Sequence, residues 1–143
     1  MRKTTWIWCV LFVFSAVGLT TAQRGSEGTP KPEQFVGTWS GSWEGAGSGG
    51  GFEVTLEPGK DGSAITGKVS VTGEPTYKAV FKSVAFDGRK MNAKYDFPAD
   101  ESAEVVLDAT FEDKTATGTW SLRAKAGGDG VVSGTWKVTR KQP

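Results

Sequence analysis

The chain has 143 residues, with 17 basic and 16 acidic side chains, no histidine and a single cysteine, Cys9. This nearly neutral balance gives no electrostatic basis for binding nucleic acid or anionic lipid. The lack of histidine, with the one cysteine in the N-terminal apolar run, excludes zinc or copper sites of the usual kind, thiolate nucleophiles and histidine-based triads.

The N-terminus is typical of a secretory signal peptide. Met1-Arg2-Lys3 is basic, residues 6–19 are almost uniformly apolar, and Ala22 is a small residue that a signal peptidase accepts. The apolar run is shorter than the roughly 18 residues that a membrane-spanning helix needs. We therefore expect residues 1–22 to be cleaved near Ala22 and the rest to be exported, to the periplasm or beyond, without a membrane anchor. Without Arg2 and Lys3 the chain has 15 basic and 16 acidic residues, a net charge of −1.

Two regions follow the predicted signal peptide. Residues 23–34 contain Gly, Ser, Glu, Pro and Lys but no large apolar side chain, which predicts a flexible leader. Residues 35–141 have the length of one domain. The sequence therefore predicts a single globular domain.

Alternating apolar and polar residues mark the strands of this domain. In residues 35–44, every second residue from Phe35 to Trp43 falls on one face, as in a half-buried strand. Residues 45–51 are so rich in glycine that they predict a loop. The same alternation predicts further strands near residues 52–57, 65–72, 77–86, 91–97, 103–111, 115–123 and 132–138. Within residues 77–86 the apolar face changes parity, which indicates a bulge near Lys82-Ser83.

These features predict an all-β fold with eight strands joined in sequence by short turns. Such an antiparallel meander removes its edges by closing into an up-and-down barrel, so we expect an eight-stranded barrel. A β-sandwich is the alternative, but it would need a long crossing connection that the sequence does not contain.

Several short motifs resemble the calycins, the group that includes lipocalins and avidins. Gly37-Thr38-Trp39 is similar to their Gly-x-Trp motif, and the spacing from there to Thr66-Gly67 is similar to the first hairpins of streptavidin-like proteins. The ending Gly-Thr-Trp-x-x-x-Arg also resembles small exported bacterial barrels of unassigned function. The resemblance implies a ligand-binding barrel, and some barrels of this kind isomerise or cyclise the ligands that they bind.

The resemblance also has consequences for individual residues. In calycins an arginine near the end of the barrel covers the first-strand tryptophan, which implies that Arg140 stacks on Trp39 and helps to close the barrel. The side-chain parity of the last strand independently turns Arg140 inward. Biotin binding is not implied, because Gly41 and Val69 stand where the avidin pattern has asparagine and tyrosine.

The candidate site lies at one end of the predicted barrel. The longer, glycine-rich loops all fall at the same end of a meander, so this end is the expected mouth. The inward residues nearest it are apolar except for two phenol hydroxyls, a lining suited to a small hydrophobic molecule. They are Trp43, Phe52, Val71, Tyr77, Tyr95, Phe97 and Leu122.

The sequence supports three functional hypotheses. The first is non-enzymatic binding of a small hydrophobic or amphipathic ligand inside the barrel, with no metal or other cofactor. The second is a protein-interaction or inhibitor module that acts through its loops and leader and has a filled core. The third is an enzyme without a metal, an isomerase or cyclase, in which Tyr77 or Tyr95 acts as acid or base. A carboxylate pair at Asp100-Glu101 is a further but weaker possibility, because Asp is favoured in turns for local hydrogen bonding.

Overall fold

The computed structural model describes residues 28–61, 64–128 and 131–143. The predicted signal peptide and the first part of the predicted leader lie outside these residues. In the described ranges, no helix is long and apolar enough to cross a membrane.

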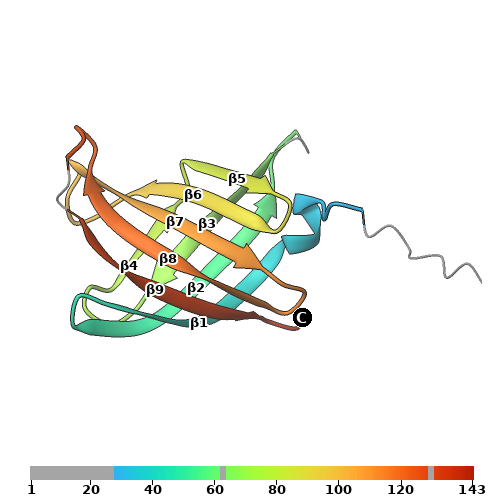
Figure 1. The fold of residues 1–143 in the computed structure, drawn as a ribbon, viewed down its shortest axis with the longest axis horizontal. Coiled ribbons are helices and arrows are strands. Elements are labelled where there is room, and N and C mark those ends of the chain that lie inside the picture. The colour runs from blue at the N-terminus through green and yellow to red at the C-terminus, as the bar shows by residue number, and fades with distance from the viewer. Residues whose placement is uncertain (1–27, 62–63, 129–130) are drawn as a thin grey trace, which may run out of the picture.

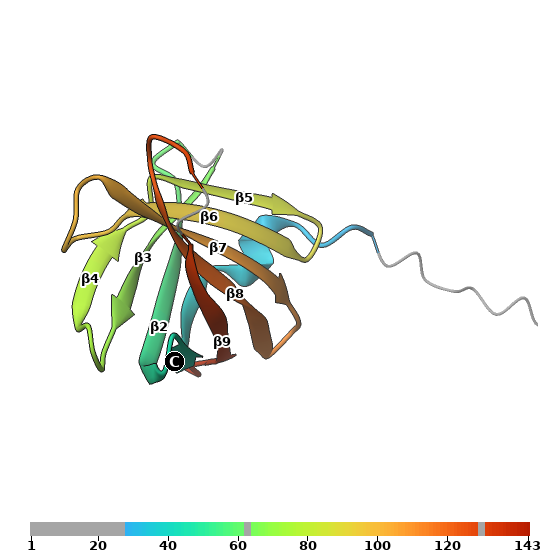
Figure 2. The same cartoon turned by 60° about the vertical axis from the view of Figure 1, so that its left-hand side comes forward.

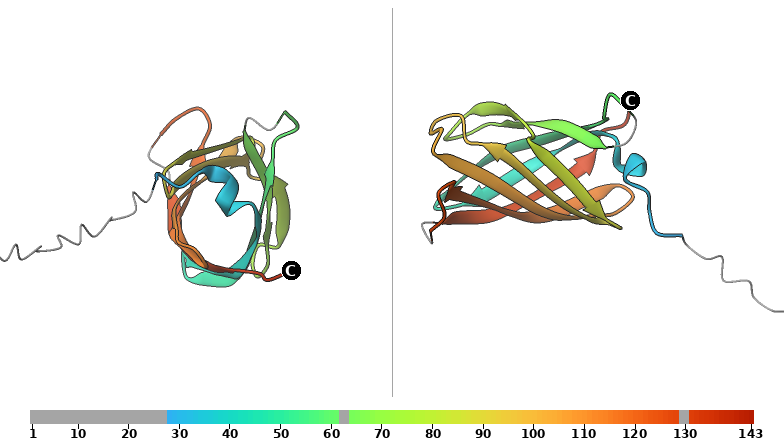
Figure 3. Two further views of the ribbon diagram at one scale, coloured as in Figure 1. Left: turned by 90° about the vertical axis from the view of Figure 1, so that its right-hand side faces the viewer. Right: turned by 90° about the horizontal axis from the view of Figure 1, so that it is seen from above.

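The domain is a single antiparallel sheet that curls around its own core (Figures 1 and 3). A short 3-10 helix, η1 (Pro32–Phe35), precedes the strands. These are β1 (Gly37–Gly45), β2 (Ser48–Pro58), β3 (Ile65–Val71), β4 (Tyr77–Val80), β5 (Ser83–Asp87), β6 (Lys90–Asp96), β7 (Ala103–Phe111), β8 (Thr115–Ala124) and β9 (Val132–Arg140). Their order in the sheet is β4-β3-β2-β1-β9-β8-β7-β6-β5. The all-β meander is confirmed, and the continuous sheet is not the two-sheet sandwich of the alternative.

The structure has nine strands in its described part, where the sequence predicts eight. The predicted strand at residues 77–86 is divided into β4, which pairs with β3, and β5, which pairs with β6 (Figure 2). At the break, the Phe81 amide donates to the Gly67 carbonyl and the Lys82 amide to the Lys94 carbonyl. The chain therefore changes partners here, and this is the physical reason for the parity change that the sequence shows. We call the boundary between β3-β4 and β5-β6 the seam.

The glycine-rich segment at residues 45–51 is mostly strand, so the prediction of a loop there is wrong. β1 and β2 pair as far as Gly45 and Ser48, leaving a two-residue turn at Ala46-Gly47. Both turn residues have positive φ, 53° and 75°, which suits a tight hairpin. At Gly50 the constraint is steric, because a Cβ there would collide with the Thr72 carbonyl oxygen.

The N-terminal end of the predicted first strand also differs from expectation. Phe35 belongs to η1, and β1 begins at Gly37, which has a φ of 135°. η1 lies across one end of the curled sheet (Figure 3, left). The Phe35 ring is 3 % exposed and stacks on Phe86, with ring centroids 5.2 Å apart. η1 thus closes this end, which we call the closed end; the opposite end, with the β1-β2 hairpin, is the open end.

The core follows the predicted inward faces. Large side chains from every strand except β4, β5 and β8 are fully or almost fully buried, and residues from those three strands pack against them. The largest of the fully buried side chains are Trp39, Tyr95, Phe111, Leu56 and Met91. The core therefore runs along the inside of the sheet, and Tyr95 extends it to the open end.

Candidate functional site

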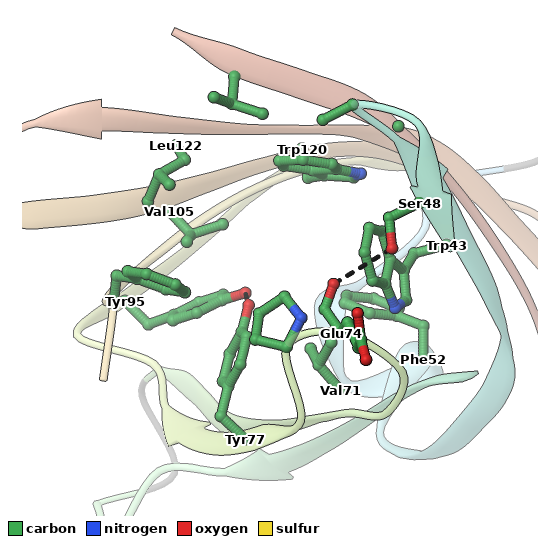
Figure 4. Close-up of a pocket in the computed structure, with 15 residues that line it drawn as sticks. Trp43, Ser48, Phe52, Val71, Glu74, Tyr77, Tyr95, Val105, Trp120 and Leu122 are labelled. Carbon is green, nitrogen blue, oxygen red and sulfur yellow. Dashed lines mark hydrogen bonds between the residues drawn. The ribbon is translucent and has the colours of Figure 1, made fainter. Parts of the chain in front are cut away.

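A cavity of about 230 Å³ lies at the open end (Figure 4). All seven residues that the sequence places near the mouth line it: Trp43, Phe52, Val71, Tyr77, Tyr95, Phe97 and Leu122. The structure thus brings the predicted set together around one space. That they bind a ligand stays a prediction.

Two rows of paired residues form opposite walls. In one wall, Phe52 on β2 pairs with Val71 on β3, which pairs with Tyr77 on β4. In the other, Tyr95 on β6 pairs with Val105 on β7, which pairs with Leu122 on β8. Side chains at paired positions point to the same face of a sheet, so each row presents a continuous apolar surface to the cavity.

Two tryptophans form the part of the wall between these rows. The Trp43 and Trp120 rings meet edge to face, with centroids 5.7 Å apart. Each indole N–H is already used: Trp43 Nε1 donates to the Thr72 carbonyl at 3.0 Å, and Trp120 Nε1 to the Glu44 carbonyl at 3.1 Å. Because these donors are satisfied, the two rings offer the cavity a rigid apolar surface.

The two tyrosines face each other across the seam. Tyr77 comes from β4 and Tyr95 from β6, and their hydroxyl oxygens are 2.8 Å apart. Burial raises the pKa of Tyr77 above its ordinary value of 10.0, although the hydrogen bond with Tyr95 opposes this. Burial also strongly raises the pKa of Tyr95, and the neighbouring Tyr77 adds to the effect. Both phenols are therefore neutral at physiological pH.

The rim of the cavity is more polar than its walls. Ser48 Oγ, at the start of β2, donates to the Glu74 carbonyl at 3.2 Å and so joins the hairpin to the turn after β3. Glu74 is the one Asp, Glu, Lys or Arg among the described residues that line the cavity. The site therefore combines an apolar interior with a single carboxylate at its edge.

Trp39 and Arg140, the predicted closure pair, lie at the closed end. The Arg140 guanidinium is 5.1 Å from the centre of the Trp39 ring, and its Nη2 donates to the carbonyls of Gln34 at 2.8 Å and Val36 at 2.6 Å. Trp39 itself is fully buried, and its Nε1 donates to the Phe35 carbonyl at 3.0 Å. The pair thus connects β1, β9 and the η1 segment and takes no part in the cavity.

Several residues that line the cavity are not among the seven predicted from the sequence. Val105 and Trp120 stand on predicted inward faces, and the register of β7 with β6 and β8 would have placed Val105 beside Tyr95 and Leu122. Ser48, Glu74, Pro75 and Val132 also line the cavity. Ser48 and Glu74 belong to turns or strand starts whose positions alternation does not specify, so no sequence pattern pointed to them.

Asp100, one of the predicted carboxylate pair, makes hydrogen bonds within its own turn. Asp100 Oδ1 accepts hydrogen bonds from the backbone amide and the Oγ of Ser102, at 2.9 Å and 2.6 Å, and these bonds lower its pKa. This is the local turn role that favours Asp in loops. In the described ranges, no group of three or more His, Cys, Asp or Glu side chains is arranged to hold a metal ion.

Comparisons with known proteins gave no match. A scan of protein-family models, a search of curated proteins and a search of solved structures each found nothing similar to this chain.

Proposed function

We propose that this protein is an exported, calycin-like binding protein that holds a small, mainly apolar molecule in the cavity at its open end. The observation that carries the proposal is the cavity of about 230 Å³, which is lined by six aromatic side chains. Apolar pockets with a few converging polar groups are the usual form of small-molecule sites. The N-terminal sequence features support export.

Features of the walls also support binding. Trp43, Phe52 and Tyr95 are at most 8 % exposed, and strand pairing fixes the backbone on which they stand. A site that is formed before the ligand arrives loses little conformational entropy on binding. The cavity favours this proposal over an interaction module with a filled core.

The enzyme hypothesis has weaker support. A general base at neutral pH needs a pKa near the working pH, but burial raises the pKa of both phenols away from that range. Tyr77 and Tyr95 are therefore better suited to hold a ligand by hydrogen bonding than to remove a proton from it.

The experiment that tests the proposal is a calorimetric titration of the purified protein with ethylbenzene, an uncharged probe that is small enough for the cavity. We expect saturable binding with one site per chain. Absence of binding by ethylbenzene and by other small apolar probes would overturn the proposal.

A pair of variants tests the location. Leu122 lines the cavity, so Leu122→Trp should fill part of it and weaken ethylbenzene binding by about tenfold or more, as expected for a loss of roughly 1.4 kcal/mol. Arg123 is the next residue on β8 and is exposed on the outer face. Arg123→Trp adds the same indole outside the cavity and should leave binding unchanged.

A further inference from the structure

The Tyr77–Tyr95 pair specifies the chemistry of the ligand more closely than the cavity alone. Resting on the proposed function, we infer that the cavity selects an uncharged ring compound with one hydrogen-bond acceptor, which accepts the remaining O–H of the tyrosine pair. The inference depends on which polar groups around the cavity are already used and which are free.

Counting the hydroxyl hydrogens of the two tyrosines shows that one hydrogen-bond donor is free. Each phenol has one O–H, and the 2.8 Å contact uses one of the two, whichever way it points. The hydrogen bond between the two hydroxyls is the one that either makes to a described residue, so the other O–H has no acceptor among them. The indole donors of Trp43 and Trp120 are both taken by backbone carbonyls. One phenol O–H is therefore left to donate to a molecule inside the cavity.

The position of this donor suits a ligand. Tyr77 and Tyr95 both line the cavity, and Figure 4 shows their hydroxyl groups meeting at its side, opposite Trp43 and Phe52. A ring held against these aromatic side chains would place a substituent toward the hydroxyl pair. A buried donor without a partner costs about 1–3 kcal/mol, so a ligand that supplies an acceptor is preferred to one that does not.

The charge of the lining excludes anionic ligands. No lysine or arginine lines the cavity in the described part of the chain, and the one charged lining residue is Glu74 at the rim. An anion would lose its hydration inside the cavity without gaining a cationic partner, and it would also meet the Glu74 carboxylate. An uncharged carbonyl or ether oxygen satisfies the phenol without this loss.

The volume suits a ligand of about one ring. The cavity of about 230 Å³ can enclose a substituted benzene, whereas a steroid or a long acyl chain would extend out of the open end. Acetophenone, ethylbenzene and benzoate therefore form a matched set of probes: one neutral acceptor, one hydrocarbon of the same shape and one anion.

The test compares the wild-type protein with the double variant Tyr77→Phe/Tyr95→Phe by calorimetric titration. Replacing both partners of a hydrogen bond by apolar groups of the same shape preserves the packing, so we expect the variant to fold. Acetophenone and ethylbenzene differ in their hydration free energies. We therefore compare the affinity of each probe for the wild type with the affinity of the same probe for the variant. We expect acetophenone to bind the variant about fivefold more weakly, ethylbenzene to bind the variant at least as tightly as the wild type, and benzoate to bind the wild type at least tenfold more weakly than acetophenone.

The outcomes separate this inference from the proposed function. Ethylbenzene binding with acetophenone affinity unchanged by the double substitution would overturn the inference and leave the proposed function standing. Benzoate binding as tight as that of acetophenone would also overturn it. Failure of all three probes would overturn the proposed function itself. If the double variant loses its folded near-ultraviolet spectrum, the comparison of acetophenone with benzoate on the wild-type protein still tests the inference.

Discussion

The two ends of the sheet are built from the same residue types but differ in how completely they are filled. At the closed end, Trp39 and Phe111 are fully buried and their rings meet at 4.9 Å. Phe35 from η1 fills the space beside Phe111, at a centroid distance of 5.3 Å. At the open end, Trp43 and Trp120 also meet edge to face, but they border a cavity.

The difference comes from the segments outside the strands. η1 contributes Phe35 to the closed end, whereas the tight Ala46-Gly47 turn and the turn containing Glu74 contribute no large side chain to the open end. Among the described residues, the closed end thus receives a large apolar side chain from outside the strands, Phe35 of η1, and the turns named here give the open end none. We conclude that the closed end stabilises the fold, and we propose that the open end binds the ligand.

The largest expected effect is the difference between two phenylalanine truncations. Phe111→Ala removes a fully buried ring from the closed end and should lower the free energy of unfolding by about 3–5 kcal/mol. Phe97 lines the cavity and is only partly buried, so Phe97→Ala should cost less than about 2 kcal/mol. Urea unfolding of both variants measures the contrast. Equal losses would show that the open end is as tightly packed as the closed end.

The tyrosine pair should make the open end sensitive to alkaline pH. Burial raises the pKa of both phenols, so above pH 10.0 the unfolded chain loses protons that the folded chain keeps. Their contribution to stability is complete below this pH. As the pH rises, it is lost by up to about 1.4 kcal/mol per pH unit for each phenol.

The chain contains only two tyrosines, so tyrosinate absorbance reports on this pair alone. In the folded protein the absorbance should stay low well above pH 10.0 and appear when urea is added. The double variant Tyr77→Phe/Tyr95→Phe is the control for the stability measurement. Lysines titrate in the same pH range, and this variant shows their contribution to the pH dependence of stability. Normal titration of both phenols in the folded protein would contradict the burial of the pair.

Arg140 should have a moderate effect that is confined to the closed end. Arg140→Ala removes the contact with the Trp39 ring and two hydrogen bonds to backbone carbonyls, and should lower the free energy of unfolding by about 1–2 kcal/mol. Arg140→Lys should recover only part of this free energy, because the lysine ammonium does not reproduce the planar arrangement of donors in the guanidinium. Ethylbenzene affinity should be unchanged in both variants, and a loss of binding at constant fold would show that the ends are coupled.

The smallest expected effect lies on the outer face of the seam. Asp96 pairs with Lys125 at 3.0 Å and Lys82 at 3.1 Å, and hydrogen bonds from these lysines lower its pKa. The pairs are exposed to solvent, which screens them. Asp96→Asn should therefore leave the urea midpoint unchanged at both low and high salt. A loss as large as that of Phe97→Ala would show that these ion pairs contribute substantially to stability despite their exposure.

The inward faces and the seven candidate residues could be predicted from the sequence because both follow from period and connectivity. Alternation gives the inward side of each strand, and a meander places successive turns at alternating ends. These two facts are sufficient to bring Trp43, Tyr77 and Tyr95 to the same end.

The remaining features depend on contacts that alternation does not encode. The division of residues 77–86 into β4 and β5 results from a change of pairing partner at Phe81 and Lys82. The position of Phe35 in η1 depends on bonds that the Phe35 carbonyl and Arg140 make in three dimensions. The cavity volume depends on side chains from several strands together, so it cannot be predicted from any single segment of the sequence.

The most direct test of the account is a nuclear magnetic resonance titration of the indole N–H signals with ethylbenzene. Trp43 and Trp120 line the cavity, whereas Trp39 lies at the closed end and serves as an internal control. The account predicts that the Trp43 and Trp120 signals shift and saturate together while the Trp39 signal stays in place. Shifts of Trp39 equal to those of Trp43, or no saturable shift at all, would contradict a closed end and an open end with separate roles.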